Sequence, residues 1–357
     1  MAISKWSGRA GNNMAQLTGA VAIANATGSV VVALPHALLG NGSARIWDFR
    51  SMACITRQGE VVLREDPPDF SLAGEPGVSI ASSMFFNRSN CEAVGLDKMS
   101  LRTRREVTLQ LIAPRTPAMA TPSEGSIPGS PGHRLRPHLV IHIRGGDIFS
   151  KRATLGRRRQ YGQPPLAFYR RILIDGGYLS VGWPVTVLHE DDGNPVVGAL
   201  KAWWPPSAAG AVQFVSGGNL ADVVATLTGA THLVAAVSTL SINFGLLAAP
   251  HLVRVFIPFC RQHLLAGFLY DNGDDVPIAI TRVQSTHAKQ RHRTLMRRLI
   301  DARTAHGQID IGISGFCYEF PSYGVQDRWM NTPAQLKSMV EYPESSVVAY
   351  PLPSSWA

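Results

Sequence analysis

The sequence lacks the features that mark several common protein classes. Only 4 of the 357 residues are cysteines, and none of them forms a C-x-x-C pair. We therefore expect no disulfide scaffold and no metal centre, and a reducing compartment is the simpler interpretation. No apolar run approaches the roughly 18 residues that a membrane-spanning helix needs, and the first residues contain no apolar signal segment. These absences predict a cytoplasmic protein without a transmembrane segment.

Charged side chains are also scarce, at 17% of the residues, whereas hydrophobic ones make up 45%, the composition of a chain that buries a core. The length is enough for two compact α/β domains. The 34 Lys and Arg against 25 Asp and Glu give a formal charge of +9, which favours an anionic partner. The basic stretches 151–159 and 289–298 lack interleaved aromatics for base stacking, so we expect no nucleic acid partner.

Strands and helices are predicted to alternate along the chain. At the N-terminus, strands at 2–3 and 30–34 flank a helix with an apolar stripe from Met14 to Ala24. The Pro/Gly/Ser-rich run 113–137 is interpreted as a linker. Beyond it, strands are predicted at 138–144, 185–188, 212–215, 233–237 and 253–257, and helices at 166–174, 196–203, 219–229 and 242–249. This alternation predicts an α/β fold with a parallel, doubly wound sheet, in two domains, 1–137 and 138–357.

The segment 142–147, H-I-R-G-G-D, is the first candidate for chemistry. Residues of a strand alternate between its faces, so His142 and Arg144 are expected on one side and Ile143 on the other. An arginine at the carboxyl end of a strand, in a basic protein, suits a phosphate because its guanidinium can grip two oxygens at once. The alternative from the residues alone is an Arg144–Asp147 pair that closes a turn.

Two further segments could bind an anion or a nucleotide. Residues 238–241, S-T-L-S, stand between a predicted strand and helix, where hydroxyl and amide groups can hold an anion, although ordinary helix capping explains them as well. The loop 8–13 resembles the dinucleotide fingerprint only loosely, and a tight turn that opens a helix explains its glycines but not Asn12 and Asn13.

Together and in this order, these segments resemble the fucosyltransferases that use GDP-fucose. Residues 8–16, G-R-A-G-N-N-M-A-Q, resemble the G-R-L-G-N-Q-x-x-Q opening of α-1,2-fucosyltransferases. Residues 142–147 resemble the H-x-R-R-G-D signature shared by the α-1,2, α-1,6 and protein O-fucosyltransferases. The segment 222–241 resembles their later motif, in which a helix Asp precedes a strand and an S-[ST]-F-S turn. The resemblance covers ordered islands between about residues 4 and 260.

The resemblance implies a GT-B-like fold, with two Rossmann-like domains, that transfers a sugar with inversion from a GDP-sugar to a hydroxyl of a glycan or glycoconjugate. Domain 1–137 would then serve the acceptor and domain 138–357 the nucleotide sugar, without a metal or other cofactor. By this resemblance Arg144 would bind the diphosphate and His142 and Asp222 the guanine. Ser238 and Thr239 would contact phosphate, while Gly11 and Asn12 would lie near the donor sugar or the acceptor.

The sequence departs from the family pattern at two places. Gly145 stands where the signature has its second arginine, which removes one possible phosphate contact. No Asp or Glu lies between Asp147 and Asp175, so the carboxylate that serves as base in the α-1,6 enzymes has no counterpart, and Asp147 is the only local candidate. These departures keep a second hypothesis open, a nucleotide- or phosphate-binding protein of the same fold without catalysis.

Overall fold

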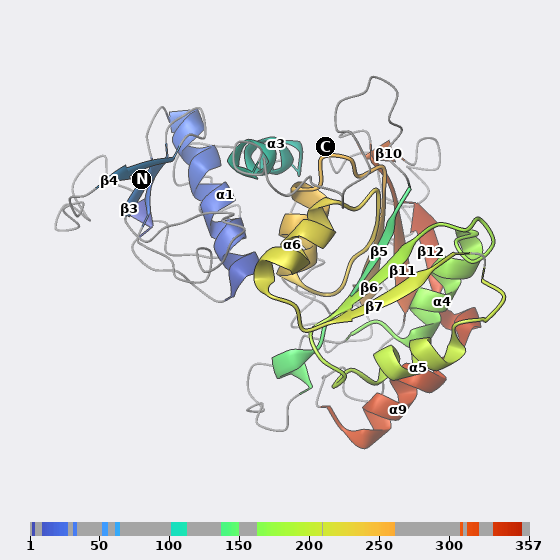
Figure 1. Ribbon diagram of the computed structural model, residues 1–357. Coiled ribbons are helices and arrows are strands. Elements are labelled where there is room, and N and C mark those ends of the chain that lie inside the picture. Colours follow the sequence, from blue (N-terminus) through green and yellow to red (C-terminus); the bar gives the residue numbers. More distant parts are fainter. Residues whose placement is uncertain are drawn as a thin grey trace, which may run out of the picture. The chain divides into compact units, whose positions relative to one another are not determined.

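The computed structural model of the chain divides into two compact units (Figure 1). Unit 1 comprises residues 1–136, 219–228 and 242–250, and unit 2 comprises 137–218, 229–241 and 251–357. The structure describes residues 2–3, 9–27, 31–33, 52–55, 61–64, 101–112, 137–149, 163–208, 210–260, 308–309, 313–320 and 331–351. Most of the predicted linker 113–137 therefore lies outside the described residues, as do the basic stretches 151–159 and 289–298.

Unit 1 contains a small sheet and the helices α1 (Ala10–Thr27), α3 (Leu101–Ile112) and α6 (Leu220–Thr228). Its sheet has the order β1 (Ala2–Ile3), β2 (Val31–Ala33), β3 (Met52–Ile55) and β4 (Val61–Arg64). The strands β1 and β2 are parallel, as a strand–helix–strand opening requires, and the remaining pairs are antiparallel. Helices α1 and α3 pack together, and the hydroxyls of Thr18 and Thr108 lie 3.0 Å apart between them.

Unit 2 is built on six parallel strands, which confirms the α/β class and the parallel sheet. They are β5 (Leu139–Ile143), β6 (Val185–His189), β7 (Val212–Ser216), β8 (His232–Val234), β9 (Arg254–Cys260) and β11 (Ile313–Phe320). Two short strands, β10 (Gln308–Ile309) and β12 (Val348–Pro351), pair antiparallel with β11. The central strand β5 is buried at all five positions, as expected for a parallel strand covered on both faces.

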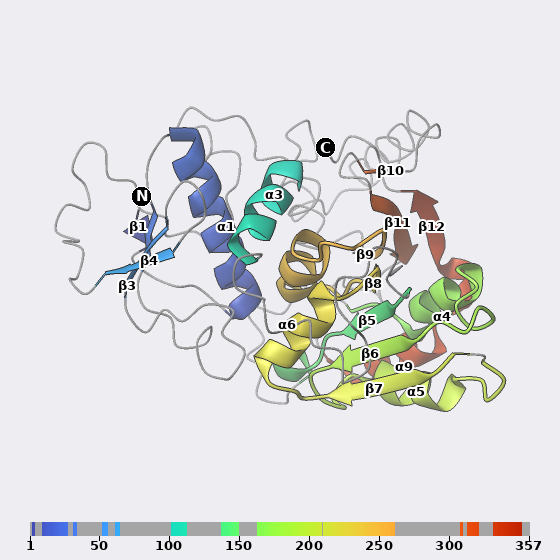
Figure 2. The same cartoon turned by 45° about the horizontal axis from the view of Figure 1, so that its top comes forward.

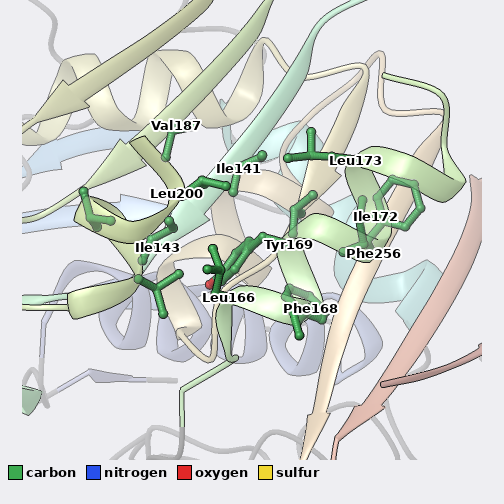
Figure 3. Packing of buried hydrophobic residues seen from close by; sticks show 14 of the residues in the cluster. Ile141, Ile143, Leu166, Phe168, Tyr169, Ile172, Leu173, Val187, Leu200 and Phe256 are labelled. Carbon is green, nitrogen blue, oxygen red and sulfur yellow. The ribbon is translucent and has the colours of Figure 1, made fainter. Parts of the chain in front are cut away.

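Three helices of unit 2 share one apolar core with the sheet (Figures 1 and 2). They are α4 (Leu166–Asp175), α5 (Pro195–Trp203) and α9 (Pro333–Glu341), and they contact one another. Figure 3 shows alternate residues of β5, Ile141 and Ile143, in this cluster with Tyr169 of α4 and Leu200 of α5. Because alternate strand residues face opposite ways, His142 and Arg144 leave β5 on the other side, as the sequence predicts.

The strand order of unit 2 determines where a ligand is expected. Numbered along the chain, the parallel strands lie in the order 3-2-1-4-5-6, from β7 through β6, β5, β8 and β9 to β11. The chain therefore leaves β5 toward β6 on one side and later returns to β8 on the other. In open sheets of this order, ligands bind outside the carboxyl ends of the two strands at that reversal. Here those strands are β5 and β8, which end at Ile143 and Val234.

Several elements differ from the sequence expectation. Helix α1 begins at Ala10, so Gly11 and Asn12 lie in its first turn and not in a loop before it. The segment expected as an α-helix at 242–249 forms a wider π-type helix, η5 (Ser241–Leu247). A strand at 253–257 was expected to end the sheet, but β11 continues it. The predicted domain 138–357 also differs from unit 2, since 219–228 and 242–250 belong to unit 1.

Candidate functional site

Arg144 lies at the reversal of the sheet and reaches toward the loop after β8. It is the first residue after β5, and its Nη1 donates to the Ser238 hydroxyl at 3.3 Å. Its Nη2 donates to Asp147 Oδ1, also at 3.3 Å, so the ion pair expected of a closed turn is present as well. The Arg144 side chain is 16% exposed and that of Asp147 67% exposed. The guanidinium thus connects the loops that follow β5 and β8, and a small part of it is exposed to solvent.

Ser238 is held by backbone contacts that orient its hydroxyl. The side chain is buried, and its oxygen accepts from the Leu240 amide at 3.2 Å in addition to Arg144. Because both acceptor positions of the oxygen are then used, the proton of the hydroxyl is what Ser238 can offer to another group. Ser238 and Arg144 together therefore present donors, which suits an anionic oxygen. Thr239 follows, half-buried, at the start of the helical segment.

His142 is part of the interior and pairs with Ser241. Its Nδ1 contacts the Ser241 hydroxyl, which also accepts from the Ala236 amide at 3.1 Å. Burial, with the positive charge of Arg144 as the second cause, lowers the pKa of His142 to about 3, so the ring is neutral at physiological pH. This pair connects the end of β5 to the start of η5. His142 is 6% exposed, and its visible role is to join these two segments.

The loop that carries Arg144 is fixed by two residues from the turn after β6. The carboxylate of Asp191 accepts from the Gly146 amide at 3.0 Å and from the Gly193 amide at 2.9 Å. The buried Asn194 donates to the carbonyl of Arg144 at 2.9 Å and accepts from Val196, which caps α5. These contacts fix the backbone on both sides of the guanidinium and so restrict where it can point.

The space beside Gly145 and Gly146 is already filled by side chains of the same turn. A Cβ placed on Gly145 would lie 2.5 Å from Oδ1 of Asp191, and one on Gly146 2.4 Å from both carboxylate oxygens of Glu190. The second arginine of the family signature therefore has no room at position 145 while Asp191 keeps its contacts. Because residues 145 and 146 are glycines, the carboxylates of Asp191 and Glu190 can lie against the backbone. This accounts for a glycine at the position where the fucosyltransferase signature has its second arginine.

The other predicted site residues belong to unit 1. Gly11 accepts from the Asn243 side chain at 3.0 Å through its carbonyl, and Asn12 is half-buried in the first turn of α1. Asp222 lies exposed in the first turn of α6, where its carboxylate accepts from the Asn219 side chain at 2.6 Å. The structure thus brings together Arg144, Asp147 and Ser238 within unit 2, whereas Gly11, Asn12 and Asp222 form contacts inside unit 1.

Sequence reasoning missed the residues that hold the loop, Asp191 and Asn194, and the carboxylate of Glu190 that lies against it. The segment 189–195 lies between the strand predicted at 185–188 and the helix predicted at 196–203, and no site was assigned to it. A signal was present, because acidic and amide side chains directly after a buried strand lie at the same edge of a parallel sheet as the loop after its neighbour. Using it required knowing that β5 and β6 are adjacent.

No family model, no curated protein and no solved structure matches this chain. The resemblance to the fucosyltransferases therefore stays a prediction. In the part of the chain that the structure describes, no three His, Cys, Asp or Glu side chains are grouped as a metal ion would require. Among the helices of that same part, none combines the length and the apolar character needed to cross a membrane.

Proposed function

We propose that this protein is a glycosyltransferase that moves a sugar from a GDP-sugar, GDP-fucose being the first candidate, to a hydroxyl of a glycan or glycoconjugate. The observation that carries the proposal is the contact of Arg144 with Ser238 across the reversal of a 3-2-1-4-5-6 sheet. That position is where such sheets bind nucleotides, and the two side chains offer donors to a diphosphate. The order of the three family motifs along the chain is the second support.

The proposed chemistry is a single displacement with inversion. A base removes the proton of the acceptor hydroxyl, its oxygen attacks the anomeric carbon, and the bond from that carbon to the phosphate oxygen breaks. The electron pair leaves with GDP, and Arg144 and Ser238 stabilise the charge that develops on the diphosphate. Asp147 is the candidate base, since it is exposed, but its ion pair with Arg144 also fits a residue that positions the guanidinium.

The finer architecture belongs to the same proposal. Two Rossmann-like domains of the GT-B type, one for the acceptor and one for the nucleotide sugar, are proposed, and the guanine contacts stay a prediction of the resemblance. A cytoplasmic location and transfer without a metal are proposed with it. Arg144 would then neutralise the leaving diphosphate in the place of a cation.

The first test compares nucleotide sugars and an Arg144 variant. GDP-fucose, GDP-mannose and UDP-glucose are screened for thermal stabilisation and for release of the free nucleotide. We expect GDP-sugars to stabilise the protein and to be turned over, and R144K to lower turnover about tenfold or more, because a point charge cannot hold two oxygens at once. The control R170K changes an arginine of α4 that pairs with Glu344, and we expect no effect. Full turnover by R144K would show that the phosphate assignment is wrong.

A second variant separates the two roles of Asp147. D147N removes the ion pair with Arg144 and so changes GDP affinity in either case. If Asp147 is the base, D147N also abolishes turnover; if it only positions Arg144, part of the turnover remains. Calorimetric titration with GDP gives the affinity, and the rate of GDP-fucose hydrolysis gives the turnover.

The alternative function is a nucleotide- or phosphate-binding protein without catalysis. Its support is Gly145, since Asp191 fills the space of the second arginine and leaves a single guanidinium at the loop. Binding of GDP-fucose without hydrolysis or transfer would favour this alternative. In that case R144K still weakens binding, because the anion site is the same.

A further inference from the structure

A second group of charged side chains lies at the amino-terminal edge of the sheet of unit 2. Arg254 is the first residue of β9, and the parallel register pairs it with His232, the first residue of β8, and with Ser314 of β11. The candidate site lies beyond the carboxyl ends of strands, whereas Arg254 stands where strands begin. Phe256, two residues further along β9, belongs to the core that α4 shares with the sheet. Because alternate strand residues share a face, Arg254 lies on that same face.

The contacts of Arg254 do not neutralise its charge. Its Nε donates to the Ser314 hydroxyl at 3.2 Å, and its guanidinium carbon lies 5.9 Å from the centre of the Phe316 ring. The residue is half-buried. Within the part of the chain that the structure describes, no carboxylate forms an ion pair with it. A guanidinium that is partly removed from water without a carboxylate destabilises the folded state, and an anion beside it would offset that cost.

Tyr178, in the turn after α4, brings a hydroxyl close to Arg254. The residue is buried, and its ring stands edge-on to that of Phe256 with 6.0 Å between the ring centres. Burial raises the pKa of Tyr178, and the positive charge of Arg254 acts against that rise. Among the described residues, no oxygen accepts the proton of this buried hydroxyl. Tyr178 can therefore donate that proton to a further group beside Arg254.

Arg171 and Asp175, in the last turn of α4, complete the group. Nη2 of Arg171 and Oδ2 of Asp175 form an ion pair at 3.1 Å, and the two side chains are 38% and 36% exposed. The Nε–H of Arg171 is buried and finds no acceptor among the residues that the structure describes. The pKa of Tyr318 is raised to about 12, by burial first and then by Asp175, although the charges of Arg171 and Arg254 oppose the rise. The group therefore carries one excess positive charge, and part of it is exposed to solvent.

We propose that Arg254 and Tyr178, with Arg171 beside them, bind an oxyanion of the size of inorganic phosphate. The excess positive charge attracts an anion, and the Tyr178 hydroxyl and the Arg171 Nε–H both need acceptors. A tetrahedral oxyanion offers several acceptors at once, and its hydrogen bonds with a guanidinium are strong because both partners are charged. The site uses neither Arg144 nor Ser238, so it does not depend on the proposed function.

The test measures phosphate binding in the full chain carrying R144M, because Arg144 is itself a phosphate ligand in the proposed function. Thermal unfolding and isothermal titration calorimetry are followed as phosphate is added and chloride is lowered to keep the ionic strength constant. We expect phosphate to stabilise this parent protein. Adding R254M should weaken phosphate binding about tenfold or more, and adding Y178F, which keeps the ring, about threefold. These are the losses expected for a charged and for a neutral hydrogen bond.

The matched control is R170M in the same parent. Arg170 also lies over an aromatic ring, that of Trp203 at 4.8 Å, but it has a carboxylate partner in Glu344 at 2.7 Å. We expect R170M to bind phosphate as tightly as the parent. Circular dichroism checks that each variant folds, and Y178F tests the site even where R254M does not. A parent that phosphate stabilises no more than chloride does would overturn the inference, as would R254M and Y178F variants that bind phosphate like the parent. Neither result bears on GDP binding by the wild type.

Discussion

At the scale of single residues, Gly146 combines a left-handed backbone with a neighbouring carboxylate. We expect G146A to lower the free energy of unfolding by about 1–2 kcal/mol, because an L-residue is strained at this φ. The clash with Glu190 adds to this cost, and the double variant G146A/E190A recovers that part. Urea unfolding followed by circular dichroism measures both.

The matched control for Gly146 is Gly198 of α5, where an added Cβ meets nothing within 4 Å. We expect G198A to leave stability unchanged or to raise it by about 0.5–1 kcal/mol, since alanine favours a helix. Equal effects of G146A and G198A would contradict the conformation described for the loop after β5.

His142 makes stability depend on pH. Its pKa in the folded protein is lowered to about 3 by burial and by Arg144, and the ordinary value is 6.5. Above pH 6.5 the ring is neutral in the folded and in the unfolded protein, so His142 does not make the free energy of unfolding depend on pH there. As the pH falls from 6.5 toward 3, the unfolded state gains the proton first, so stability is lost over that window.

The variant H142N tests this dependence, because the asparagine oxygen can keep the contact with Ser241 but does not titrate. We expect the loss of unfolding free energy between pH 7 and pH 5 to be smaller in H142N than in the wild type. Part of the dependence remains, since burial and the positive charge of Arg254 also lower the pKa of His232, to about 4. The control variant H251N replaces an exposed histidine. A wild-type slope in H142N would contradict the assignment.

At the scale of elements, Asn194 joins the start of α5 to the end of β5. The variant N194A loses a helix cap, which costs about 1 kcal/mol of stability, and it also frees the carbonyl of Arg144. We therefore expect lower thermal stability and a smaller stabilisation by GDP. Thr332 caps α9 with a reciprocal contact to Gln335, so T332A has a similar cost in stability. We expect GDP to stabilise T332A as much as it stabilises the wild type. If GDP stabilised both variants equally poorly, the effect of N194A would not come from the contact of Asn194 with the Arg144 carbonyl.

Sequence patterns predicted the elements of unit 2 where apolar runs are short and bounded. The strands β5, β6 and β7 and the helices α4 and α5 lie within two residues of their predicted bounds, and so does α6 of unit 1. The strand β11 was missed, because Ser314, Gly315 and Glu319 interrupt its apolar character and its partner β9 lies far away in sequence. The π-type helix η5 was expected as an α-helix, since the two share nearly the same apolar spacing.

The candidate site shows the same division between local and long-range information. Arg144 and Ser238 could be singled out because each follows a recognisable strand. Their contact, and the filling of the space at Gly145 by Asp191, depend on the order of strands in the sheet. The periodicity of a sequence shows which residues share one face of a strand, but it does not show which strand lies next to it. The residues that hold the loop, Asp191 and Asn194, could therefore not be assigned from the sequence.

At the scale of the whole molecule, the chain passes between the two units several times. Segments 219–228 and 242–250 belong to unit 1, although they stand in the sequence between strands of unit 2. In unit 1, Arg105 of α3 holds the second of these segments. Its guanidinium is buried and donates to the carbonyls of Leu246 at 2.5 Å and Ala249 at 2.7 Å. The segment begins directly after Ser241, the partner of His142.

Replacement of Arg105 is therefore expected to affect both stability and nucleotide binding. R105M fills a similar volume but leaves two buried carbonyls without their donor, and we expect a loss of roughly 2–3 kcal/mol in the free energy of unfolding. R105K keeps the charge but cannot donate from two fixed nitrogens, so its loss is intermediate. The control K337M removes an exposed cation from an ion pair on the surface of α9 and should change stability by less than about 0.5 kcal/mol. Because Ser241 precedes the anchored segment by one residue, stabilisation by GDP should decrease in R105M and not in K337M. An R105M variant that is destabilised but retains the full GDP response would show that anchoring this segment does not help to form the proposed nucleotide site.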